Sequence, residues 1–342
     1  MLPDASQNLG ELPVATASGR PQALTQFLTD SFTTSLLVVH AGKVAYEWSF
    51  RASGLTDVLP CYSITKSVLG VVAGALIERG DLDPDRGAVT YVPELGGGGY
   101  RGVTVRDLLD MRTGGDYRET HDSDGELANL VKSRSQEPGA PFESVHDMVS
   151  RIERVGRHDG PFAYRSLDTE ALGWVIERAT GTAMDLLAEE IVLGPLGCVA
   201  AMFTKDSHGQ VAHSGGLWMR PVDVARFGLM ILNSGAVGDH QIVSPFFVKD
   251  LRAGNRFDAN ASSGGSYRNQ FWVPQRGGRE LLALGIHGQM LWMDAASDTV
   301  FVKLSAWPQP SDPALLSTTY AVARACAAAL GGGPAGDITL RR

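Results

Sequence analysis

The hydrophobic positions follow a strand-like pattern near the two ends of the chain and a helical pattern between them. Residues 35–50 form two β-rich runs around a short turn that contains glycine, which is typical of a hairpin. Residues 281–294 and 299–307 form two more such runs near the C-terminus. This arrangement predicts one antiparallel sheet that is assembled from the two ends of the chain.

The middle of the chain has mostly helical spacing. Residues 63–79 are apolar almost all round and end at Gly80, which predicts a buried central helix. Thr104, with Asp107 three residues later, is typical of a capping box at the start of a helix over residues 105–111. Helices are also predicted over residues 172–179, 221–232 and 313–330.

These elements predict an α/β protein in which an antiparallel sheet from both termini is flanked by helices. Residues 1–100 and 255–342 are expected to form a discontinuous sheet domain, and residues 101–254 a mainly helical subdomain against it. Residues 113–143 are rich in glycine, serine and acidic residues without a clear period, which predicts a long loop. Long loops of this kind often act as lids over enzyme sites.

Composition argues against several classes of partner. The 342 residues include 30 Lys and Arg against 38 Asp and Glu, a net charge of −8, with no run of basic residues. Nucleic acid is not an expected partner, because phosphates require clustered positive charge. The longest apolar stretch, residues 68–77, is much shorter than the roughly 18 residues of a membrane span, so no membrane partner is expected.

Cysteines and the first residues bear on the cellular compartment. Cys61, Cys198 and Cys326 are far apart and form no CxxC, so neither a disulfide framework nor a thiolate metal site is predicted. The first residues contain no basic segment and no apolar core, unlike a secretory signal. The expected location is the cytoplasm.

Ser63 and Lys66 fall in the first turn of the predicted buried helix. Their i,i+3 spacing places Ser63 Oγ and Lys66 Nζ on one face. An apolar environment would lower the pKa of the lysine, so that it could take the proton of the serine, and the helix N-terminus would help to hold an oxyanion. The alternative is that Ser63 only caps the helix while Lys66 reaches solvent.

Two further sites could assist this pair. Tyr164 precedes a predicted helix, and a tyrosine hydroxyl beside an amine can relay protons, although a packed aromatic is the more frequent role. Ile286 and His287 lie between glycines in a predicted strand, where a backbone N–H could complete an oxyanion hole. His287 is interpreted as structural, because the chain has no GxSxG elbow.

Other sequence motifs give weaker evidence for a functional site. Residues 97–102 fit GxGxxG but do not follow a strand, so a dinucleotide site is rejected. The chain has no HExxH, P-loop or EF-hand motif, so no metal or cofactor is implied. His121, His208 and His213 lie in polar stretches and are expected to be solvated.

Four segments carry motifs of one family in the right order: YSITKS at 62–67, VTVRDLLDMRTGG at 103–115, FAYRSLDTEALGWVIERATG at 162–181 and LGIHGQMLWMDAASDTVFVKLSAWPQP at 284–310. They resemble the penicillin-recognising serine hydrolases, and within them the 6-aminohexanoate-dimer hydrolase (nylon-oligomer hydrolase) branch of the class C β-lactamase-like fold. The resemblance implies an acyl-enzyme mechanism without a cofactor, and a catalytic cleft between the sheet and the helical subdomain. The residue roles that it implies are Ser63 as nucleophile, Lys66 as base, Tyr164 as proton relay, and the N–H groups of Ser63 and Ile286 as oxyanion hole.

The chain also departs from the β-lactamases and DD-peptidases of this family. Ser166 stands where they carry Asn, and apolar Ala283 and Leu284 stand in place of the Lys and Thr of their K-T-G motif, so penicillins are expected to bind poorly. The nylon-oligomer branch uses a lid tyrosine, for which Tyr117 and His121 are the candidates. Ser214 is a further expected substrate contact.

Three functions are compatible with these residues. The first is a serine hydrolase that cleaves small linear amides or esters through an acyl-enzyme, with carboxylesterase activity. The second is a β-lactamase or DD-peptidase, and the third is a non-catalytic ligand-binding protein. The expected partner is a small-molecule amide or ester, and the expected state is a monomer or homodimer.

Overall fold

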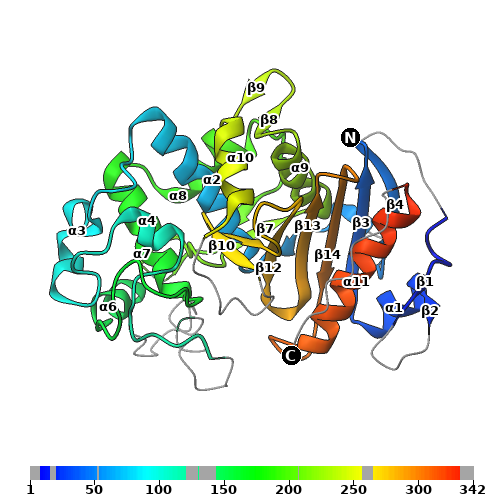
Figure 1. The fold of residues 1–342 in the computed structure, drawn as a ribbon, viewed down its shortest axis with the longest axis horizontal. Coiled ribbons are helices and arrows are strands. Elements are labelled where there is room, and N and C mark those ends of the chain that lie inside the picture. The colour runs from blue at the N-terminus through cyan, green and yellow to red at the C-terminus, as the bar shows by residue number, and fades with distance from the viewer. Residues whose placement is uncertain are drawn as a thin grey trace.

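The computed structural model describes residues 8–15, 21–51, 54–120, 130, 144–206, 208–255 and 265–331. Its centre is a seven-stranded antiparallel sheet built from both ends of the chain, as predicted (Figure 1). In their order across the sheet, the strands are β10 (Ser266–Arg268), β11 (Phe271–Val273), β12 (Glu280–Gly285), β13 (Gln289–Asp294), β14 (Thr299–Ser305), β3 (Thr33–His40) and β4 (Lys43–Ser49). The two ends meet where β14 pairs with β3, with Val302 opposite Leu37.

Both faces of this sheet are buried, as the alternation along β13 shows. Leu291 and Met293 belong to the core on the face covered by α2 and α9, whereas Met290 and Trp292 belong to the core formed with α1 and α11. The molecule therefore has helices on each side of the sheet, and Figure 1 shows α11 lying along it. These helices are α1 (Leu24–Asp30), α2 (Ile64–Arg79), α9 (Pro221–Leu232) and α11 (Pro313–Ala329).

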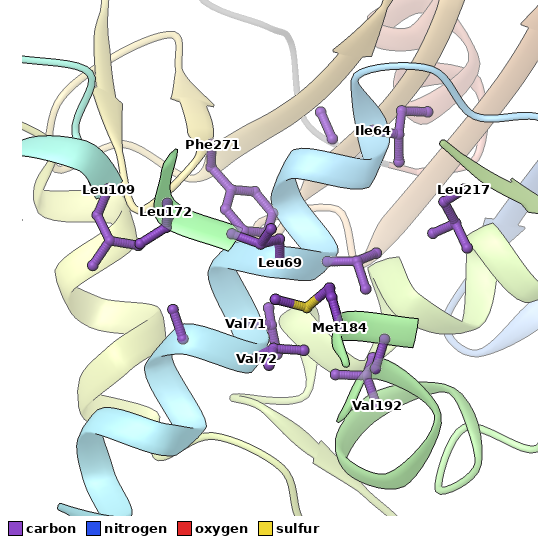
Figure 2. Packing of buried hydrophobic residues seen from close by; sticks show 14 of the residues in the cluster. Ile64, Leu69, Val71, Val72, Leu109, Leu172, Met184, Val192, Leu217 and Phe271 are labelled. Carbon is purple, nitrogen blue, oxygen red and sulfur yellow. The ribbon is translucent and has the colours of Figure 1, made fainter. Parts of the chain in front are cut away.

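Helix α2 is surrounded by other elements on all sides, which explains its uniformly apolar sequence. Its residues are buried from Ile64 to Leu76, and it ends at Gly80, which has a φ of 82°. A Cβ at Gly70 would lie 2.3 Å from the Asn269 carbonyl oxygen, so a glycine is needed for this close packing. Figure 2 shows side chains from several neighbouring elements packed around the helix. The predicted buried central helix is confirmed.

The other helices fill the part of the molecule beside the sheet. Thr104 and Asp107 form both hydrogen bonds of the predicted capping box at α4 (Val105–Leu109), and α9 has the predicted bounds. The remaining helices are α3 (Ala88–Tyr91), α6 (Val145–Ser150), α7 (Ser166–Thr180), α8 (Met184–Ala188), α10 (Pro245–Ala253), the 3₁₀ turns η1 (Gly54–Thr56), η2 (Pro93–Gly97) and η4 (Ile286–Gly288), and the π-helical η3 (Glu189–Leu193). The short strands pair as β1 (Pro13–Val14) with β2 (Gln22–Ala23), β5 (Leu59–Pro60) and β6 (Met202–Phe203) on either side of β7 (Leu217–Met219), and β8 (Ala236–Val237) with β9 (His240–Gln241).

One predicted strand is wrong. Residues 281–294 form two antiparallel strands, β12 and β13, joined by the tight turn at Ile286–Gly288. The turn contains no asparagine or proline; His287, with a φ of 59°, and Gly288, with a φ of 84°, take its left-handed positions. Side chains on both strands are buried, so the hydrophobic pattern continues through the turn.

The division into domains at residues 101 and 254 remains a proposal, because α9 from that interval packs against β13 and β14 of the sheet. Of the predicted loop 113–143, residues 121–129 and 131–143 lie outside the described residues. Across the part of the chain that is described, no helix combines the length and apolar character needed to cross a membrane.

Candidate active site

Ser63 lies at the start of α2, directly after a strained residue. Tyr62 has a φ of 44°, in the left-handed region that side chains rarely adopt. The N–H of Cys61 donates to the Leu217 carbonyl of β7 (2.9 Å), and the N–H of Leu217 donates to Thr65 Oγ1 (3.0 Å). Strand β7 and the first turn of α2 therefore hold the backbone on both sides of Ser63, which stabilises the strained turn.

Lys66 is buried beneath Ser63. The residue is only 1% exposed. Its Nζ donates hydrogen bonds to Ser63 Oγ (2.7 Å) and to the Ser214 carbonyl (2.7 Å). Nζ also lies 5.1 Å from the centroid of the Tyr164 ring. The alternative in which Lys66 reaches solvent is wrong. A buried amine in contact with a serine hydroxyl is the arrangement that a lysine base requires.

Tyr164 faces the same serine from the other side. Its ring stacks on Trp272, with centroids 5.4 Å apart. Burial, and to a lesser extent the negative charge of Glu119, raise the pKa of the Tyr164 hydroxyl far above its ordinary value, while its hydrogen bond to Ser63 acts in the opposite direction. The hydroxyl therefore keeps its proton at neutral pH and can donate it.

The start of α7 fixes Tyr164. Glu119 accepts hydrogen bonds from the Ser166 N–H (2.9 Å) and from Ser166 Oγ (2.6 Å), so a carboxylate from another loop caps the helix. The helix begins at Ser166, earlier than the predicted residue 172. Local sequence could not reveal a cap that is supplied 47 residues away.

Asp168 holds this first turn of α7 from the protein interior. It accepts hydrogen bonds from Thr113 Oγ1 (2.9 Å) and from the Tyr100 hydroxyl (2.9 Å). Burial raises the pKa of Asp168 to about 6, although the charge of Arg165 and these hydrogen bonds act in the opposite direction. Asp168 thus anchors the segment that carries Tyr164.

The turn between β12 and β13 comes close to the backbone that precedes Ser63. A Cβ at Gly285 would lie 2.7 Å from the Cys61 carbonyl oxygen, and one at Gly288 would lie 2.3 Å from the Trp307 ring. The two glycines therefore permit close approach to the protein itself. This packing places Ile286 on the wall of the same cavity as Ser63.

His287 contacts backbone groups on the far side of that turn. Its N–H donates to the Pro310 carbonyl (2.9 Å), and Nδ1 lies 2.8 Å from the Trp307 carbonyl oxygen. The ring also lies beside Tyr62, with centroids 5.4 Å apart. These contacts hold the turn in place.

A cavity of about 650 Å³ opens above Ser63. One wall is largely apolar and comes from the sheet, α11 and the loop between them. Its side chains include Trp272, Leu284, Ile286, Met290, Trp307 and Leu316. The opposite rim is polar, with Asp116, Arg118, Glu119, Ser166 and Ser214. The site can thus accept a substrate with an apolar portion next to a reactive carbonyl.

The cavity brings together most of the predicted site residues. Its lining includes Ser63, Tyr117, Tyr164, Ser166, Ser214 and Ile286. Lys66 lies below this lining, and His121 lies outside the described residues. Ser166 already uses its hydroxyl on Glu119, and Ser214 places its backbone carbonyl on Lys66.

His213 is buried, so its predicted exposure to solvent is wrong. It lies between Glu170 and Glu177 of α7, with Nδ1 3.1 Å and Nε2 3.3 Å from the two carboxylates. Burial alone would lower the pKa of His213, but its hydrogen bonds to both carboxylates and their charges raise it to about 9. One available signal was the seven-residue spacing of the two glutamates on one helix face. Glu119 offered no such signal, because an acidic loop residue normally faces water.

Comparisons with known proteins agree with this geometry. The Beta-lactamase family model matches residues 22–325. A 6-aminohexanoate-dimer hydrolase from Paenarthrobacter ureafaciens is 32% identical over 299 residues, which cover 84% of this chain and 76% of that protein. A Bacillus anthracis structure, provisionally named a 6-aminohexanoate-dimer hydrolase, superposes with a TM-score of 0.87 at 26% identity, covering 98% of this chain and 89% of that one. The octameric penicillin-binding protein homologue from Pyrococcus abyssi shares the fold, with a TM-score of 0.70 at 18% identity over 92% of this chain and 77% of that one.

Proposed function

The chain belongs to the beta-lactamase family and is a serine hydrolase of that fold, and from this premise we propose that it cleaves small linear amides or esters through an acyl-enzyme on Ser63. We propose 6-aminohexanoate-dimer hydrolase-like chemistry with carboxylesterase activity. The observation that carries the proposal is the 2.7 Å hydrogen bond between Lys66 Nζ and Ser63 Oγ at the floor of the cavity.

The proposed mechanism assigns one step to each group. Lys66 takes the proton of Ser63 Oγ as the oxygen attacks the substrate carbonyl, and the N–H groups of Ser63 and Ile286 hold the oxyanion. Tyr164 then gives its proton to the leaving amine or alcohol as the bond to the carbonyl carbon breaks, and it is reprotonated from Lys66. Water then gives a proton to Lys66 as its oxygen attacks the acyl carbon. The bond between this carbon and Ser63 Oγ breaks, the acid leaves, and Ser63 Oγ takes a proton back from Lys66.

The lining of the cavity supports a linear substrate rather than a penicillin. Glu119 places a carboxylate on the polar rim, where it also occupies the hydroxyl of Ser166. Leu284, on the other wall, offers no charge. A penicillin has a carboxylate that the K-T-G motif of the β-lactamases holds with polar and cationic side chains, and apolar Leu284 stands within that motif here. The second function, β-lactamase or DD-peptidase, is therefore the weaker proposal.

A substrate panel tests the proposal on the purified protein. The panel contains p-nitrophenyl butyrate, the linear 6-aminohexanoate dimer and nitrocefin. Ser63→Ala is expected to lower ester turnover by at least about 10³-fold, because the acyl-enzyme can no longer form. Ser67→Ala is the matched control on the same helix, since Ser67 Oγ is buried and bound to the Gln270 carbonyl (2.8 Å). It should retain wild-type turnover.

The other functions give different results in this panel. Nitrocefin turnover comparable to ester turnover would establish the β-lactamase. A non-catalytic ligand-binding protein would form no covalent adduct at Ser63 with a fluorophosphonate, and Ser63→Ala would then leave all rates unchanged.

We propose that the protein is a monomer or homodimer. Light scattering during size-exclusion chromatography measures the mass directly. An octamer, as in the Pyrococcus abyssi homologue, would contradict this proposal.

A further inference from the structure

Below the floor of the cavity, one carboxylate of α7 holds two successive residues of the segment before β7. Glu170 Oε1 accepts the Ser214 N–H (2.8 Å), and Oε2 accepts the His213 N–H (3.1 Å). Oε2 also lies 3.1 Å from His213 Nδ1. Glu170 is 2% exposed and His213 is 3% exposed, so these bonds form in the protein interior, where they are strong.

Helix α7 has a recess that fits the His213 ring. A Cβ at Gly173 would lie 2.2 Å from this ring, so only glycine leaves room for it. Glu170 precedes this glycine by three residues and Glu177 follows it by four, and each carboxylate contacts one nitrogen of the ring. The His213 ring is therefore held by a carboxylate at each nitrogen, and it keeps the Glu170 carboxylate in one orientation.

The held segment carries the second acceptor of Lys66. The residue whose N–H is bound to Glu170 is Ser214, and its carbonyl accepts the hydrogen bond from Lys66 Nζ (2.7 Å). Nζ donates hydrogen bonds to this carbonyl and to Ser63 Oγ. A shift of the Ser214 backbone would therefore move the amine relative to the serine oxygen.

We propose that Glu170 is a positioning residue for the Lys66 base, acting through the backbone of Ser214 and held in place by His213. The inference rests on the proposed function, because it assigns a role within the acylation of Ser63. Neither Glu170 nor His213 lines the cavity, so neither touches substrate.

Two glutamate variants separate positioning from general support of the fold. Glu170→Gln removes the charge that holds both His213 and Ser214. Glu177→Gln removes a carboxylate from the same helix and the same histidine, and leaves the bond to Ser214 intact. If the cluster only stabilised the fold, the two changes would affect activity alike. If Glu170 positions Lys66, acylation should fall much more in Glu170→Gln than in Glu177→Gln, because Glu177 acts on Ser214 only through His213 and Glu170.

The readout is the rate constant of acylation by p-nitrophenyl butyrate, measured before steady state. Glu170→Gln is expected to lower it by about 100-fold, the size of effect seen when a catalytic group is misplaced by about 1 Å. KM should change less than the acylation rate constant, because Ser214 is one of many residues that line the cavity, whereas its carbonyl accepts the hydrogen bond of Lys66 directly. His213→Gln, which frees one side of Glu170, should give a smaller loss in the same direction.

Hydrogen exchange at the Ser214 amide provides a second readout that needs no activity. Exchange should become faster in Glu170→Gln and stay slow in Glu177→Gln. Unchanged exchange in Glu170→Gln would overturn the inference, as would equal losses of acylation in the two glutamate variants. A folded wild-type protein with no burst and no adduct at Ser63 would instead refute the proposed function, whatever the exchange shows.

Discussion

Two buried lysine–serine pairs in this molecule have nearly the same local geometry and different surroundings. Lys66 and Lys303 are 1% and 0% exposed. Their Nζ atoms donate to Ser63 Oγ at 2.7 Å and to Ser305 Oγ at 2.6 Å, and each amine lies near an aromatic ring. The hydrogen bond between a lysine and a serine is therefore not enough to define a catalytic pair.

The difference lies in what surrounds each pair. Ser63 lines the cavity, and Lys66 has a second acceptor in the Ser214 carbonyl. Lys303 lies on the face of β14 that packs against Phe27 of α1, and burial lowers its pKa to about 7. The position of Ser63 in the lining of the cavity distinguishes the first pair, so a lysine–serine motif predicts chemistry only together with a cavity.

The largest expected effect is on activity, in Lys66→Met compared with Lys303→Met. Lys66→Met should lower kcat/KM for p-nitrophenyl butyrate by about 10²- to 10⁴-fold, the usual contribution of a general base. Lys303→Met should keep the wild-type value, because Ser305 is outside the lining of the 650 Å³ cavity. A comparable loss in both variants would remove the distinction between the pairs.

The next effect concerns the partner that faces Lys66. Tyr164→Phe should slow amide hydrolysis at least about tenfold more than ester hydrolysis, because only an amine leaving group needs a strong proton donor. Tyr267→Phe is the matched control, since this ring packs edge-on against Tyr164 (centroids 6.0 Å apart). It should affect both substrates equally. Equal losses on both substrates in Tyr164→Phe would refute the proton relay.

The buried Lys303 should make the free energy of unfolding depend on pH. Its pKa is about 7 in the folded protein and about 10.4 in the unfolded chain, so the unfolded state binds more protons between these values. The free energy of unfolding should therefore rise with pH from about 7 to 10, and the cost of the buried charge should be complete below pH 7. Lys303→Met should gain roughly 2–4 kcal/mol at pH 6 and less at pH 9, measured by urea denaturation. A gain that does not depend on pH would contradict this.

The smallest effect is expected from Ser305→Ala. Loss of one buried hydrogen bond to Lys303 should lower the free energy of unfolding by about 1 kcal/mol. Ester turnover should not change, in contrast to Ser63→Ala. Reduced turnover with intact folding would show that the two pairs are coupled.

Elements with a strong local signal could be predicted from the sequence. The apolar run of α2 and the capping box of Thr104 and Asp107 depend on neighbours in the chain, and both are found. Strands β10 and β11 have three residues each, too few to show a period. The turn at His287 was missed because most side chains of its flanking strands are buried, and such apolar runs hide a turn.

The residues of the candidate site also differ in how far they could be predicted from the sequence. Ser63 and Lys66 share one helical turn, so their spacing alone brought them together. Glu119, Glu170 and His213 reach the site from loops and helices far apart in the chain. The polar stretch around His213 suggested exposure to solvent, and only the folded chain shows the two carboxylates that allow this ring to be buried.

The pairing of β14 with β3 also sets when the active site can exist during synthesis. His40 and Thr299, which contact each other across these strands, are 259 residues apart in the chain, and the turn at Ile286 belongs to the same late part of the sheet. Pairings of such long separation form after the local ones, because closing the loop costs entropy first. A chain still on the ribosome, with Ser63 and Lys66 already made, therefore lacks the strands and the turn that complete the cavity. We therefore expect hydrolysis only after the last strands have been released, and we expect a chain that stops before β14 to be inactive.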